Sequence, residues 1–131
     1  MRILLAEDDF VTRKFMNNFL SKYGECDVTV DGKEAVEAFE MAIEEGEPYD
    51  LVCLDIMMPV MDGYQALQGM RDIEERLGIP EEVRVKVVMT TALNDEANVR
   101  MAFEMGCVMY SGKPIDQYRF ETALRKLGMI E

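Results

Sequence analysis

Short apolar runs alternate with longer amphipathic segments along the whole chain. Runs rich in Val, Ile, Leu and Tyr are typical of strands and are predicted over 2–6, 26–30, 49–55, 83–90 and 107–111. A helical period predicts helices over 11–24, 32–46, 62–78, 94–106 and 115–128. Strict alternation of the two kinds of segment indicates an α/β fold, with one parallel sheet covered by helices on both faces.

The predicted helices carry recognisable start and stop signals. In the first helix the apolar face is expected to consist of Val11, Phe15, Met16, Phe19 and Leu20. Gly24 is predicted to end that helix, because glycine readily adopts the conformation that follows a last turn. Asp62 and Gln65 have the spacing of a capping box, which predicts that the third helix starts at Asp62.

Length and charge narrow the function classes. A chain of 131 residues, 49% of them apolar, fits one domain with a real core. The formal net charge of -12 argues against nucleic-acid binding. No apolar run approaches the roughly 18 residues of a membrane span, and no signal segment is apparent, so we expect a cytoplasmic protein without membrane insertion.

Cysteine and histidine usage excludes several kinds of site. Cys26, Cys53 and Cys107 lie in or beside apolar stretches without CxxC spacing, which favours buried thiols over disulfides or a zinc site. The chain contains no histidine. Imidazole metal ligands and histidine-dependent nucleophilic triads are therefore excluded.

Polar residues follow the apolar runs at the points where the strands end. They are Glu7, Asp8, Asp55, Thr91 and Lys113. Because the carboxyl ends of parallel strands share one edge of the sheet, where ligands of open α/β sheets bind, we expect these side chains to lie close together. Asp55 is the single carboxylate in a run that is otherwise apolar, which marks it as a functional group.

The residue types at this edge suit phosphoryl transfer. Clustered acids without His or Cys favour a hard, oxygen-seeking ion such as Mg²⁺, with Mn²⁺ as an alternative. Lys113 could neutralise one carboxylate and hold a phosphoryl oxygen, while Thr91 supplies a hydroxyl. One carboxylate would act as the nucleophile, as in aspartyl phosphates. Asp9 is instead interpreted as an acid at a helix N-terminus.

Four segments at strand ends carry a family resemblance: ILLAEDD, LVCLDIMMPVMDG, VVMTTA and YSGKP. In this order the chain resembles the receiver domain of bacterial two-component response regulators, of the chemotaxis-regulator type. The resemblance implies a flavodoxin-like, doubly wound sheet of five parallel strands in the order 2-1-3-4-5 with five helices. It also leads us to expect a single receiver domain over 1–131, with no output domain.

The resemblance assigns roles to the polar cluster. Asp55 would be the phosphorylated residue, and Asp8 would bind Mg²⁺ directly together with Asp55 and the main-chain carbonyl of Met57. Glu7 would hold the ion through water. Lys113 would contact the phosphoryl group, with a cis peptide bond to the proline that follows.

Signalling residues are implied in the same way. Thr91 would move toward the phosphoryl group and Tyr110 would be the aromatic switch. The family's usual output face, formed by the fourth helix, fifth strand and fifth helix, would include Met101, Tyr110 and Tyr118 as candidate contacts.

The resemblance also implies the partners. Because the chain lacks histidine, the donor imidazole must belong to a sensor histidine kinase or a histidine phosphotransfer protein. The downstream target is a protein of unidentified kind. The chain would be a signalling protein that assists its own phosphoryl transfer and slow dephosphorylation. Met57 and Leu93 flank the path of the hydrolytic water in this family, and both apolar side chains are expected to prolong the phosphorylated state.

Three alternatives remain open at this stage. An aspartyl-phosphate hydrolase of the haloacid dehalogenase type would need an acid two residues after the nucleophile, where this chain has Met57. A flavodoxin would need a hydroxyl- and glycine-rich phosphate loop after the first strand, and the acidic EDDFVTR would repel a phosphate. A degenerate receiver could serve as a phosphorylation-independent scaffold, although the expected site residues are all in place.

Overall fold

Five parallel strands form one sheet in the order β2-β1-β3-β4-β5. The computed structural model describes residues 1–92 and 96–131, with side chains for 1–92 and 100–131. The strands are β1 (Arg2–Ala6), β2 (Glu25–Thr29), β3 (Leu51–Asp55), β4 (Lys86–Thr91) and β5 (Met109–Gly112). The helices are α1 (Phe10–Leu20), α2 (Gly32–Glu44), α3 (Gly63–Arg76), α4 (Glu96–Glu104) and α5 (Gln117–Lys126), and a 3-10 helix spans Glu81–Val83. The predicted doubly wound α/β fold is confirmed.

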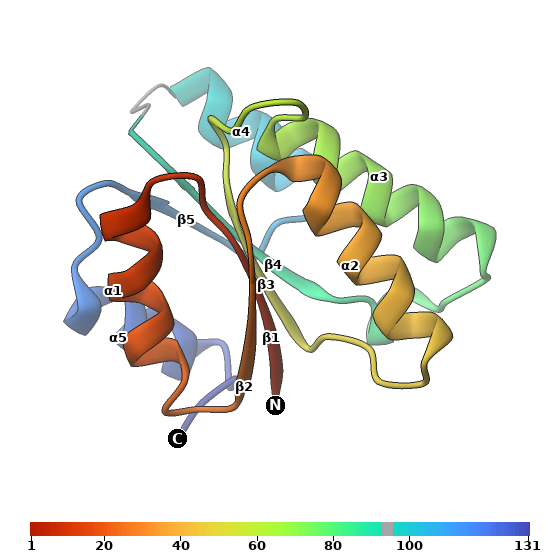
Figure 1. Cartoon of the computed structure of the whole chain (residues 1–131), viewed down its shortest axis with the longest axis horizontal. Coiled ribbons are helices and arrows are strands. Elements are labelled where there is room, and N and C mark those ends of the chain that lie inside the picture. Colours follow the sequence, from red (N-terminus) through yellow and green to blue (C-terminus); the bar gives the residue numbers. More distant parts are fainter. Residues whose placement is uncertain (93–95) are drawn as a thin grey trace.

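Helices cover both faces of the sheet. α1 and α5 lie together on one side, and α2 and α3, with α4 next to α3, lie on the other (Figure 1). Each side has its own apolar core, and β3 contributes to both because successive strand residues point to opposite faces. Val52 and Leu54 belong to the core beneath α2 and α3, whereas Leu51 and Cys53 belong to the core beneath α1 and α5. This two-sided burial explains the uninterrupted apolar run before Asp55.

Aspartate side chains start four of the helices. Asp9, Asp31, Asp62 and Asp116 each accept a hydrogen bond from the backbone N–H three residues later. At α3 the predicted capping box forms, because the side chain of Gln65 also accepts from the backbone N–H of Asp62. The interpretation of Asp9 as a helix N-terminal acid is confirmed. These caps satisfy backbone donors that the first turn would otherwise leave unpaired.

The predicted apolar face of α1 was partly wrong. Met16, Phe19 and Leu20 are buried, but Val11 is 73% exposed and Phe15 is 40% exposed. The three buried residues follow the i, i+3, i+4 spacing of a single face. Val11 and Phe15 lie further round the helix, at its edge toward solvent, so the sequence pattern overestimated the width of the buried stripe.

Gly24 does not end α1 as predicted. The helix ends at Leu20, and the chain continues through a turn over 21–23. A Cβ atom on Gly24 would lie 1.9 Å from the main-chain oxygen of Met1. The glycine is therefore required by the close approach of the turn to the start of β1, and its backbone does not adopt the left-handed conformation of a helix stop.

Three predicted strands began too early. β3 starts at Leu51 rather than at residue 49. β4 starts at Lys86 rather than at residue 83, because Glu81–Val83 form the 3-10 helix after Pro80. β5 starts at Met109 rather than at residue 107. The N–H of Cys107 instead donates to the carbonyl of Ala102, which completes the end of α4.

The cysteines are all free, as predicted. Cys53 and Cys107 are buried, whereas Cys26 is only partly buried on the edge strand β2. Among the described residues, no helix is long and apolar enough to cross a membrane.

Candidate functional site

The pairing of β1 with β3 brings the acidic residues together. Ala6 lies opposite Leu54 in this parallel pair, so the residues that follow them, Glu7 and Asp55, leave the sheet side by side. Asp8 is one residue further along the same loop. Both strands end at the same edge because they run parallel, as expected for a ligand site in an open α/β sheet.

The next two strands bring the hydroxyl and the lysine to the same edge. Asp55 pairs with Thr90, and Thr91 is the last residue of β4. The backbone N–H of Lys113 donates to the carbonyl of Thr91 at 2.8 Å, which fixes the chain after β5 against the end of β4. Thr91 is fully buried. The hydroxyl of Thr90 donates to the main-chain oxygen of Leu54 at 3.5 Å.

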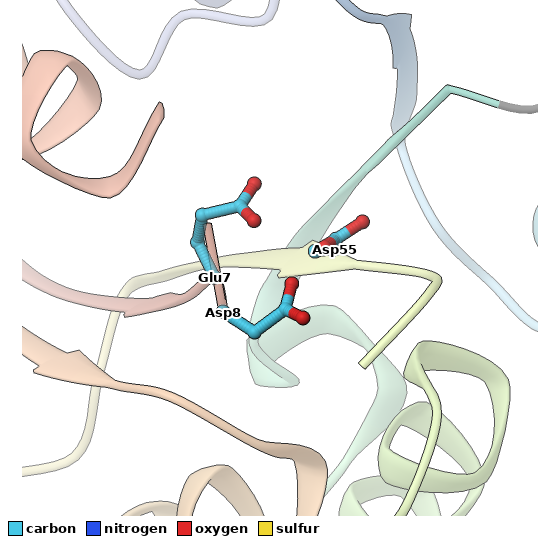
Figure 2. Close-up of side chains that lie close together, drawn as sticks. All are labelled: Glu7, Asp8 and Asp55. Carbon is cyan, nitrogen blue, oxygen red and sulfur yellow. The ribbon is translucent and has the colours of Figure 1, made fainter. Parts of the chain in front are cut away.

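Three carboxylates face a common space at this edge (Figure 2). One oxygen from each of Glu7, Asp8 and Asp55 lies within 4.8 Å of the other two. Glu7 and Asp55 are buried, while Asp8 is exposed and opens the cluster to solvent. Two buried acids at such a distance repel each other unless a cation is nearby.

Lys113 supplies positive charge to this cluster. Its Nζ lies 2.6 Å from Oε1 of Glu7 and 3.2 Å from Oδ2 of Asp55. The lysine is held at the end of β5 and its peptide bond to Pro114 is cis, as the resemblance implied. The ammonium is largely buried, so the ion pairs are screened less than surface pairs.

Charge remains unbalanced in spite of the lysine. Burial raises the pKa of Asp55 to about 7, and the negative charge of Glu7 adds to the increase, while Lys113 opposes it. Burial alone would lower the pKa of Lys113, but its close contact with Glu7 and the charges of Asp55 and Glu7 outweigh burial and raise the pKa. The folded protein thus resists ionising Asp55 while Glu7 is charged beside it.

The residues present fit a hard divalent cation. All three side chains offer oxygen atoms, and the exposed side of Asp8 leaves room for the waters that Mg²⁺ retains. Oε1 of Glu7 is buried and, apart from its ion pair, makes no hydrogen bond of regular geometry. A cation would reduce the repulsion that raises the pKa of Asp55. The roles of Asp8, Asp55, the carbonyl of Met57 and Glu7 as its direct or water-mediated ligands remain predictions.

The loop after β3 folds back over the phosphoacceptor candidate. The N–H of Met57 faces Oδ1 of Asp55 at 3.3 Å, and the Met57 side chain is exposed at the mouth of the site. Val60 adopts a positive φ of 69°, a strained value for a branched residue. A Cβ on Gly63 would lie 2.6 Å from the main-chain oxygen of Asp55, so only glycine allows the loop to close this tightly.

The predicted switch residues lie on adjacent strands. Met89 pairs with Tyr110 across β4 and β5, and both belong to the core side that α2 and α3 cover. Thr91 is two residues beyond Met89, so its side chain leaves the same face of the strand. Tyr110 is partly buried. Leu93, predicted to tune the lifetime of the phosphorylated state, lies outside the described residues.

The candidate output face offers exposed side chains. Met101 on α4 and Tyr118 on α5 are exposed, and the partly buried Tyr110 is on β5 between these helices in the chain. Their contacts with a partner remain a prediction.

Two positions that shape the site escaped the sequence analysis. The Arg13 side chain donates to the main-chain oxygens of Glu7 and Asp8, and Gly63 lets the loop after β3 approach Asp55. A glycine directly after a predicted helix cap could have indicated a close approach. A lone basic residue in the first turns of a helix carries no comparable signal, because most such residues are solvated.

Comparisons with known proteins agree with this geometry. The family model of the response regulator receiver domain matches residues 3–125. The chain is 32% identical to a probable histidine kinase 2 of Oryza sativa subsp. indica, over 95% of this chain and 12% of the relative. It is also 32% identical to a probable transcriptional regulator, ycf27, of Cyanophora paradoxa, over 96% of this chain and 47% of the relative. The chain spans less than half the length of these relatives.

Solved structures give the same picture. The co-crystal structure of the histidine phosphotransfer protein Ypd1 and the Ssk1 receiver domain of Saccharomyces cerevisiae is similar, with a TM-score of 0.82 and 26% identity over 98% of this chain and 88% of that chain. The CheX-CheY-BeF3-Mg²⁺ complex of Borrelia burgdorferi gives a TM-score of 0.80 and 25% identity, over 98% and 89%. The CKI1 receiver domain of Arabidopsis thaliana with Mg²⁺ and BeF3⁻ gives 0.79 and 25%, over 97% and 89%.

Proposed function

Because this chain belongs to the response regulator receiver domain family, we propose that it is a phosphorylatable signalling protein of the cytoplasm. It accepts a phosphoryl group from a partner histidine onto Asp55, in a reaction that depends on Mg²⁺, and signals by altered protein-protein interaction. One observation carries the proposal: Asp55 lies at the end of a central strand with Glu7 and Asp8 within 4.8 Å and Lys113 Nζ at 3.2 Å.

The residues at the sheet edge have distinct tasks in this transfer. An oxygen of ionised Asp55 attacks the phosphorus, the new O–P bond forms, and the N–P bond of the donor breaks with its electron pair returning to the imidazole. Lys113 holds a phosphoryl oxygen by charge. Glu7 and Asp8 would hold Mg²⁺ together with Asp55, and the ion would supply positive charge to the transferred phosphoryl group. Met57 stands where a hydrolase of the related aspartyl-phosphate type would need an acid.

Because the sequence contains no histidine, a donor histidine must come from outside it, and α1 offers such a donor a surface. Phe10, Val11 and Phe15 are exposed on the helix that follows the acidic loop directly. α1 carries Arg13 and Lys14 and no acidic residue, in a chain with a formal net charge of -12. A histidine-bearing partner with an apolar and acidic surface would therefore dock here, beside Asp55. A solved relative, the Ssk1 receiver, forms a complex with the phosphotransfer protein Ypd1.

The proposed docking surface can be tested by comparing the phosphorylation rates with a protein donor and with a small-molecule donor. Val11→Ser removes exposed apolar surface without touching the acids, so transfer from a histidine phosphotransfer protein should slow. Labelling by acetyl phosphate, which needs no docking surface, should stay at the wild-type rate. A variant in which both rates fall together, or neither falls, would place the donor surface elsewhere.

Intact-mass measurement after incubation with acetyl phosphate and Mg²⁺ tests the phosphorylation itself. The wild type should gain one phosphoryl group, and Asp55→Asn or EDTA should abolish the gain. Asp9→Asn is the matched control: Asp9 lies in the same loop but its carboxylate caps α1, a role that asparagine also fulfils. Full labelling of Asp55→Asn would rule out this assignment, and labelling that persists in EDTA would rule out the divalent ion.

A further inference from the structure

Arg13 reaches back from the beginning of α1 to the loop that carries two of the clustered acids. Its Nη1 atom donates to the main-chain oxygen of Glu7 at 3.0 Å and to that of Asp8 at 3.2 Å. The guanidinium lies over the ring of Phe10, with 5.5 Å between the central carbon and the ring centroid. The side chain is therefore tied to the helix at its base and to the loop at its head.

The two carbonyls belong to the peptide groups on either side of the Asp8 Cα atom. The carbonyl of Glu7 is in the peptide plane before Asp8, and the carbonyl of Asp8 is in the plane after it. The backbone of a residue has only two soft dihedral angles, and these relate its two flanking planes. One guanidinium nitrogen thus restrains both dihedral angles of Asp8, and with them the direction in which its side chain leaves the backbone.

Asp8 needs this restraint more than its neighbours. Glu7 is buried, its Oε2 accepts the N–H of Asp9 at 3.0 Å, and its Oε1 contacts Lys113. Asp55 is buried at the end of a central strand. Asp8 is exposed, so packing does not fix its carboxylate. The backbone must then set its direction.

We propose that Arg13 is a positioning residue for the divalent-ion site, which it serves by holding the backbone of Asp8 so that the carboxylate faces Glu7 and Asp55. This inference rests on the proposed function, because it assumes that the acids bind Mg²⁺. Mutation of a residue that orients a metal ligand without contacting the metal typically lowers the metal affinity about 10- to 100-fold. For an exposed ligand held through its backbone, a loss of about tenfold is expected.

The direction in which the Mg²⁺ affinity changes when Arg13 is replaced distinguishes a positioning role from a simple effect of its charge. Arg13 is a cation close to a cation site, so by charge alone its removal would strengthen Mg²⁺ binding. Positioning requires the opposite, a weaker site. Lys14, the next residue on α1, is exposed and carries the same charge, and its side chain makes no hydrogen bond or ion pair with the residues that the structure describes. It provides the matched control for loss of charge.

The test is Mg²⁺ titration of the whole chain, followed by calorimetry and by amide NMR shifts. Arg13→Met keeps the length of the stem and removes the donors, and it should lower the Mg²⁺ affinity about tenfold. Lys14→Met should leave the affinity unchanged or slightly higher. Arg13→Gln, whose side chain is too short to reach both carbonyls, should also lower the Mg²⁺ affinity. It replaces Arg13→Met in the test if that variant does not fold. At saturating Mg²⁺, labelling of the folded Arg13 variant by acetyl phosphate should return to the wild-type rate.

Folded Arg13 variants that bind Mg²⁺ as tightly as the wild type, or more tightly, would overturn the positioning role. So would a loss of affinity that Lys14→Met reproduces. Asp8→Asn separates this result from failure of the proposed function: wild-type Mg²⁺ binding that survives this substitution would show that the acids are not the ion site at all.

Discussion

Without a divalent ion, ionisation of Asp55 should destabilise the folded protein. Burial, and next the charge of Glu7, raise the pKa of Asp55 from 3.8 to about 7. A carboxyl group with a higher pKa in the folded chain binds its proton more tightly there, so its contribution favours folding at low pH. That contribution is lost as the pH rises from about 4 through about 7. At 1.36 kcal/mol per pH unit, the full loss has an upper limit of about 4 kcal/mol.

Asp55→Asn removes the titrating group while keeping the shape of the side chain. The free energy of unfolding of Asp55→Asn should exceed that of the wild type by an amount that depends on pH. We expect this difference to increase by about 2 to 3 kcal/mol between about pH 5 and about pH 8.5. Urea unfolding in EDTA, followed by circular dichroism at both pH values, measures this difference. Asp9→Asn should show no such growth, because the hydrogen bonds that Asp9 accepts from Thr12 lower its pKa and outweigh the opposing effect of burial.

Mg²⁺ should reverse the loss of stability that ionised Asp55 causes in the wild type. A ligand that binds only the folded state adds about 2.7 kcal/mol at a concentration of 100 Kd, and Asp55→Asn should gain less because it lacks one anionic ligand. A difference between wild type and Asp55→Asn that stays flat from about pH 5 to about pH 8.5 would refute the reasoning. It would mean that Lys113 already compensates the charge of Asp55 in full.

Two further predictions concern residues next to the site. Thr91→Ala should still be phosphorylated, but it should weaken the response near Tyr110 because it lacks the hydroxyl that moves toward the phosphoryl group. Phosphorylation-induced NMR shifts at Tyr110 that remain as large as in the wild type would contradict this coupling. Met57→Asn should shorten the lifetime of the phosphorylated state by a factor of a few, because an amide can orient the hydrolytic water where the exposed thioether shields it. Phos-tag gels measure the decay, and an unchanged or slower rate would argue against shielding.

Several features of this protein could be predicted from the sequence because local interactions decide them. The caps at Asp9 and Asp62 act on backbone groups within one turn. The strict alternation of strands and helices indicated a parallel sheet covered by helices on both faces. Since parallel strands end at one edge, the residues of the candidate site could be grouped from their positions alone. The strand order came from the family resemblance, because periodicity does not encode which strands are neighbours.

Tertiary structure decided what depends on groups distant in the chain. Gly24 is required by the position of Met1, and Phe15 remains exposed because the sheet covers only one side of α1. The pKa of Asp55 depends on burial and on Glu7, which the strand pairing places beside it. The hydrogen bond from Arg13 to the main-chain oxygen of Glu7 depends on where the start of α1 lies relative to the end of β1. Helix caps and periodicity are set within a few residues along the chain, whereas burial, close backbone approach and charge coupling arise only when separate elements pack against each other.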